Sequence, residues 1–118
     1  MIYHKNLAEG RWFEISFPEQ MANIGMEVLR GIKWKKKDEK YLNLAISRAI
    51  ELIDLTKMDP KNKKRLKEIC RLKEVLIDYF WGNNEYKSTD EKWENYFNSF
   101  IVYAGKLREN KRRIVCQK

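Results

Sequence analysis

The chain has 118 residues, and its 25 Lys and Arg against 17 Asp and Glu give a formal net charge of +8. Hydrophobic residues make up 43%, whereas Gly and Pro number only 5 and 2, which is typical of one amphipathic helical domain and excludes a disordered or turn-rich β chain. Cys70 and Cys116 form no CxxC pair, so we expect free thiols without a disulfide framework or zinc site. Without a membrane-length apolar run or a signal-peptide pattern, we expect a soluble cytoplasmic protein that does not bind membranes.

The first predicted element is an irregular N-terminal arm over residues 1–15. Its hydrophobic side chains follow no helical period, and we expect the aromatic ones to pack on the body. Ser16, Pro18 and Glu19 then form a capping box with a proline in the first turn, which predicts a helix from residue 16 to about residue 35. Its apolar side chains share one face at three- and four-residue spacing, and they are Met21, Ile24, Gly25, Val28 and Ile32.

Two further helices follow on either side of the Asp59–Pro60 pair. Asp38 caps the second helix, and Pro60 ends it. Asp59 and Pro60 are also a good start for a third helix, and Gly82 is expected to stop that helix in a left-handed conformation. Pro60 therefore separates two helices that are joined by a very short connection.

The fourth predicted helix is rich in aromatic residues and begins at a capping box of Ser88 and Glu91. Four helices with short connections favour an all-α, antiparallel up-down-up-down four-helix bundle. We assign residues 16–110 to this bundle and residues 111–118 to a basic C-terminal tail.

Positive charge is concentrated in three blocks. Residues 61–73 carry seven Lys and Arg against one Glu, residues 106–118 carry six against one, and residues 30–40 carry six against two acidic residues. In the predicted topology the first two blocks converge at one pole of the bundle, and the third block lies at the opposite pole.

A helical wheel places Lys64, Lys67 and Arg71 on one outward stripe. Such a stripe neutralises phosphates in nucleic acids, although many charged stripes are only solvated surface. The candidate nucleic-acid-binding residues are Lys61, Lys63, Lys64, Arg65, Lys67, Arg71, Lys106, Arg108, Lys111, Arg112 and Arg113, with Lys33, Trp34, Lys35 and Lys36 at the other pole.

Two features of the apolar pattern indicate contacts beyond the core. Trp34 among lysines either stacks on a base or folds over the bundle end or a second subunit, and we favour the second interpretation. Tyr41, Leu44 and Leu55 form a second apolar stripe on the second helix, which predicts a homo-oligomer interface or a central place in the fold.

Residues for catalysis are scarce. His4 is the only histidine and lies in the arm, and we find no Glu-x-x-His pair for a di-iron site and no Gly-rich phosphate loop. We therefore expect no catalytic residue, no metal and no cofactor.

The segments EQMANIGMEVLRGIKW, RAIELIDLT, DPKNKKRLKE and STDEKWENYF together resemble short bacterial four-helix-bundle proteins. The chain is similar, over about residues 16–110, to the ribosomal-RNA intervening-sequence proteins and the accessory variability proteins of diversity-generating retroelements. This resemblance implies a basic, ring-like oligomer that binds structured RNA or DNA and partners a reverse transcriptase. The expected function is that of a non-catalytic nucleic-acid-binding accessory protein, and the alternative is a protein-interaction module, such as an antitoxin or adaptor, that uses the second apolar stripe.

Overall fold

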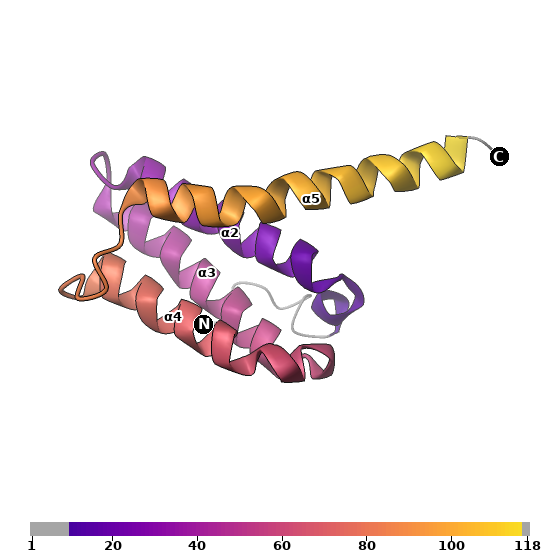
Figure 1. Ribbon diagram of the computed structural model, residues 1–118. Helices are drawn as coiled ribbons and strands as arrows, with labels where there is room; N and C mark the ends of the chain where they lie inside the picture. The colour runs from indigo at the N-terminus through magenta and orange to yellow at the C-terminus, as the bar shows by residue number, and fades with distance from the viewer. Residues whose placement is uncertain (1–9, 117–118) are drawn as a thin grey trace.

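The computed structural model describes the backbone of residues 10–116 and the side chains of residues 10–112. Within these residues every regular element is a helix, and four long helices pack together (Figure 1). The elements are η1 (Arg11–Glu14), α2 (Phe17–Trp34), α3 (Glu39–Met58), η2 (Pro60–Arg65), α4 (Leu66–Trp81) and α5 (Asp90–Cys116), where η denotes a 3-10 helix. The expected all-α class is confirmed.

The starts of α2 and α3 follow the local capping signals. The Ser16 hydroxyl oxygen accepts a hydrogen bond from the Glu19 backbone N–H at 3.3 Å, with Pro18 in the first turn of α2. The Asp38 carboxylate accepts from the backbone N–H of Lys40 at 2.9 Å and caps α3. Both helices therefore begin where the sequence predicts.

The segment after Pro60 differs from the single helix that we expected. Asp59 does cap it, because its carboxylate accepts from the Lys61 backbone N–H at 3.1 Å, but the next six residues form the 3-10 helix η2 before α4 begins. Asn62 is 0% exposed and donates from its side chain to Gln20 Oε1 at 2.8 Å and to the Thr56 carbonyl at 3.0 Å. These long-range bonds hold the tighter turn against the body.

The connection between α4 and α5 also corrects the prediction. Gly82 is extended, and Asn84 and Lys87 take positive φ angles of 54° and 55° instead. The Asp78 carboxylate accepts from the backbone N–H groups of Glu85 and Tyr86, which folds this connection back along α4. Thr89, and not Ser88 as expected, caps the start of α5, because Thr89 Oγ1 accepts a hydrogen bond from the Lys92 backbone N–H at 3.1 Å.

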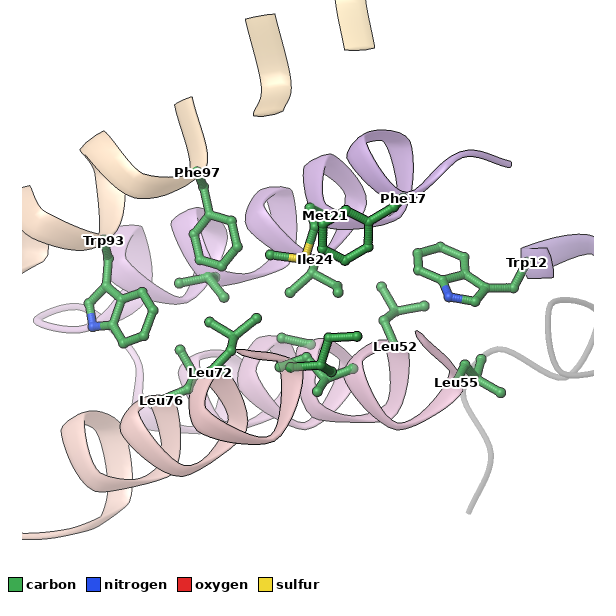
Figure 2. Packing of buried hydrophobic residues seen from close by; sticks show 14 residues of the cluster. Trp12, Phe17, Met21, Ile24, Leu52, Leu55, Leu72, Leu76, Trp93 and Phe97 are labelled. Atoms are coloured by element: carbon green, nitrogen blue, oxygen red, sulfur yellow. The ribbon is translucent and has the colours of Figure 1, made fainter. Parts of the chain in front are cut away.

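The core lies between the four long helices and reaches η1 (Figure 2). Trp12 of the predicted arm is 1% exposed and belongs to this core, whereas Tyr3 and His4 lie outside the described residues. Gly25 permits the closest approach of α2 to α5, because a Cβ at this position would lie 2.7 Å from the Phe97 ring. α2 thus packs tightly along α5 as well as along α3.

A buried polar network fastens the segments at one end of the core. The Trp12 indole N–H donates to Thr56 Oγ1 at 3.0 Å, and the Gln20 side chain donates to the Trp12 carbonyl at 3.0 Å and to the Asp59 carboxylate at 2.8 Å. Burial disfavours the Asp59 carboxylate, but hydrogen bonds from Lys61 and Gln20 outweigh it and hold the pKa of Asp59 below its ordinary value. The network joins η1, α2, α3 and η2 through side chains far apart in sequence.

Candidate nucleic-acid interface

The basic block of η2 and early α4 divides into inward and outward side chains. Lys61 donates to the Phe13 carbonyl at 3.0 Å and pairs with Asp59, and the Arg65 guanidinium lies 4.5 Å from the centre of the Phe17 ring. The outward ones are Lys63, Lys64 and Lys67, which are exposed and make no hydrogen bond or ion pair within residues 10–112.

The second basic block begins on α5 beside the start of α2 and continues toward the end of α5, which projects past the body in Figure 1. Lys106, Arg108 and Arg112 are exposed. Lys111 is also exposed, and its ammonium is 3.9 Å from Glu19 Oε1 at the start of α2. Residues 111–116 of the predicted basic tail continue α5 as helix, while the side chain of Arg113 lies outside the described residues.

Contacts with the start of α2 show how the two blocks relate. Phe17 meets Arg65 of the first block, and Glu19 meets Lys111 of the second. The Phe17 and Phe100 rings, 6.2 Å apart, join the same part of α2 to α5. Both blocks therefore border one end of the molecule, although α5 continues beyond it. We call the exposed residues Lys63, Lys64, Lys67, Lys106, Arg108 and Arg112 the basic end.

Arg71 lies one helical turn after Lys67 on α4 and is exposed, but it is in contact with an aromatic ring. Its guanidinium lies 4.7 Å from the centre of the Tyr86 ring, and the Tyr86 hydroxyl donates to Glu74 at 2.7 Å. Arg71 therefore also faces the connection between α4 and α5.

The third predicted block, at the end of α2, is partly occupied by internal contacts. The Lys35 ammonium donates to the Tyr79 hydroxyl at 2.7 Å and to Asp90 at 3.1 Å, and these bonds outweigh burial and raise the pKa of Lys35. Trp34 is half-buried, with its ring centre 4.9 Å from that of Tyr41. Lys33 and Lys36 are exposed at this end, away from η2 and the tip of α5.

The second apolar stripe needs a correction. Leu55 is only 8% exposed and belongs to the core cluster, beside Thr56, which binds the Trp12 indole. The burial of Leu55 agrees with the alternative that this part of the second helix has a central place in the fold. Leu44 is half-buried and Tyr41 is 50% exposed, and the homo-oligomer stays a prediction.

A groove between α4 and α5 was missed by the sequence analysis. α4 packs on α3 and α5 packs on α2, but the backbones of α4 and α5 approach each other less closely. The space between them is an open cavity of about 350 Å³, lined by Glu68, Arg71, Leu72, Val75, Ser88, Lys92, Trp93 and Tyr96. The spacing of apolar residues identifies the inward face of each helix, but it does not show whether a neighbouring helix covers that face.

Residues 10–112 contain no cluster of three or more His, Cys, Asp and Glu side chains that would hold a metal ion. No helix in the described range is long and apolar enough to cross a membrane.

No family model, curated protein or solved structure matches the chain. The resemblance to retroelement accessory proteins, and the reverse transcriptase partner that it implies, therefore stay predictions.

Proposed function

We propose that the protein is a non-catalytic nucleic-acid-binding protein that contacts the phosphates of structured RNA or DNA through the basic end. The observation that supports this proposal is the exposure of six Lys and Arg side chains on two segments beside the start of α2. When exposed cations of this kind neutralise phosphates, they release the counterions that are condensed on the nucleic acid.

The shape of α5 adds to this support. A helix of 27 residues is about 40 Å long, and its last turns project beyond the body. The major groove of B-form DNA admits an α-helix, and A-form RNA offers phosphates along a wide minor groove. The projecting turns would reach along a duplex while Lys63, Lys64 and Lys67 contact the neighbouring backbone.

The helix order belongs to this proposal as well. We propose that α2 to α5 follow an up-down-up-down plan, supported by contacts that join the end of α2 to the end of α4 and the start of α5 through Lys35, Tyr79 and Asp90. The opposite contacts, from Phe17 to Arg65 and Phe100, join the start of α2 to the start of α4 and to later α5.

The exposed free thiol of Cys70 supports the cytoplasm as the proposed location.

A salt series tests the function. If all six cations meet phosphates, the logarithm of the association constant for duplex DNA falls with a slope of about −5 against the logarithm of salt concentration, or roughly 1,000-fold from 50 to 200 mM. Mobility-shift titrations on a hairpin RNA and a DNA duplex measure this slope. Absence of binding at low salt, or binding with a flat salt dependence, contradicts the proposal.

A further inference from the structure

The cavity between α4 and α5 has the size and lining of a small-molecule site. Its volume of about 350 Å³ lies within the range of roughly 300–1,000 Å³ that is usual for ligand pockets. Leu72 and Val75 line the α4 side, and Trp93 and Tyr96 line the α5 side. An apolar molecule in this space would cover the exposed parts of Val75 and Tyr96, whereas Leu72 and Trp93 are already largely buried.

One polar group in the lining lacks a partner. Trp93 is only 6% exposed, and its indole Nε1 is buried without a hydrogen-bond acceptor in the part of the chain that the structure describes. In Figure 2 this nitrogen lies on the edge of the ring that is turned away from Phe97 and Met21. A buried N–H without an acceptor costs free energy. A ligand that brings an acceptor to this N–H therefore gains more binding free energy than a ligand that meets a group whose hydrogen bonds are already made.

The charged groups of the lining favour an anion. Arg71 is held over the Tyr86 ring at 4.7 Å, and the Lys92 ammonium donates to the Lys87 carbonyl at 3.2 Å. Neither cation is paired with a carboxylate among the side chains of residues 10–112. Glu68 is the only acidic side chain of the lining and lies about one helical turn before Arg71. Burial, together with the charge of Glu68, raises the pKa of Tyr96 to about 12, so its hydroxyl stays neutral.

We propose that this cavity binds a small anionic amphiphile, namely a carboxylate with an apolar body. The head group lies between Arg71 and Lys92 and accepts from the Trp93 indole N–H or the Ser88 hydroxyl. The body packs against Leu72 and Val75. The lining shares no residue with the basic end, so the proposal does not depend on nucleic-acid binding.

Titration with decanoate, below its micelle concentration, tests the proposal by ¹⁵N NMR. The four tryptophans give four indole N–H signals, and Trp93→Phe identifies the signal of Trp93. Decanoate is expected to shift that signal saturably, while the signals of Trp12 and Trp34 stay in place. Decan-1-ol, which has the same body without the charge, is expected to bind about tenfold more weakly.

Two sets of variants test the two parts of the site. Arg71→Gln with Lys92→Gln should weaken decanoate about tenfold and leave decan-1-ol unchanged, whereas the charge-matched pair Lys37→Gln with Lys40→Gln should change neither. Val75→Phe fills the cavity and should abolish the binding of both probes, with an unchanged far-ultraviolet circular dichroism spectrum as evidence of folding.

Several results overturn the proposal. They are an unshifted Trp93 signal, equal affinity for decanoate and decan-1-ol, or undiminished binding to folded Val75→Phe. A Trp93 signal that moves with protein concentration in the absence of decanoate also overturns it, because a second copy of the chain is then the occupant.

Discussion

Replacing Gly25 by alanine probes the contact that sets the spacing of α2 and α5. The added Cβ would lie 2.7 Å from Cβ, Cγ and Cδ1 of Phe97, whereas ordinary contacts begin at 3.4 Å. The ring must therefore move by about 0.7 Å or more. Phe97 is 0% exposed and stacks on Trp93 with a ring-centre distance of 5.9 Å, so it has little room to move.

The expected magnitude combines two opposing contributions. Overpacking of a core costs about 1–3 kcal/mol, and the better helix propensity of alanine returns about 1 kcal/mol. We expect Gly25→Ala to lower the free energy of unfolding by up to about 2 kcal/mol. Gly105→Ala is the matched control in α5, because nothing lies within 4 Å of its Cβ, and we expect it to gain about 0.5–1 kcal/mol.

Urea unfolding followed by circular dichroism measures both variants. Adding Phe97→Leu to Gly25→Ala should show favourable coupling, because the smaller side chain leaves room for the new methyl group. If Gly25→Ala and Gly105→Ala stabilise the protein equally, α2 and α5 do not meet at Phe97, and the packing described above is wrong.

Two further predictions concern the buried polar network. Asn62→Ala leaves Gln20 Oε1 and the Thr56 carbonyl without the donor that each has now, so we expect a loss of about 2–3 kcal/mol in urea unfolding. Asn23→Ala removes only an exposed bond to the Glu19 carbonyl and should stay within about 0.5 kcal/mol of the wild type, and equal losses in the two variants would refute the role of the network. Because the pKa of Asp59 is lowered in the folded protein, its stabilising contribution is present above its ordinary pKa and is lost as the pH falls through the folded value. The free energy of unfolding should therefore drop more steeply below about pH 4 in the wild type than in Asp59→Asn, and parallel curves would contradict the assignment.

Signals that lie within a few residues predicted the helix starts well. Ser16 and Asp38 cap the two helices that the neighbouring sequence predicts. The end of α4 was harder, because the choice between Gly82 and Asn84 for the left-handed position depends on where Asp78 draws the following backbone. A residue's preference for positive φ therefore indicates a turn without fixing which position takes it.

Features that depend on distant segments were not predictable from one sequence. Gln20, Thr56 and Asn62 are residue types usually found at surfaces, and their burial follows from bonds across 42 or more residues. Leu55 has the spacing of an outer stripe but is buried in the same region as Trp12. The opening between α4 and α5 likewise depends on how closely two helices approach, which their apolar periodicity does not specify.

The two basic blocks were readable from charge alone, but their internal partners were not. Lys61, Arg65 and Lys35 look equivalent to Lys63 and Lys64 in the sequence, yet the structure binds them to a carboxylate, to an aromatic ring and to a Tyr–Asp pair. Contact with Phe17 or Tyr79 becomes visible only when the helices are packed. The candidate surface is therefore smaller than the charge count predicted.

The most direct test of nucleic-acid binding compares two variants of equal net charge. Lys63→Gln with Lys64→Gln removes two cations from the basic end, and Lys37→Gln with Lys40→Gln removes one exposed cation from the connection between α2 and α3 and one from the first turn of α3. Mobility-shift titrations over a salt series measure the slope of the logarithm of the association constant against the logarithm of salt concentration. The first pair should reduce the magnitude of this slope by about 2, because two phosphate contacts are lost, and the second pair should leave it unchanged. Equal effects of the two pairs would show that net charge alone governs binding, and they would contradict a defined interface at the basic end.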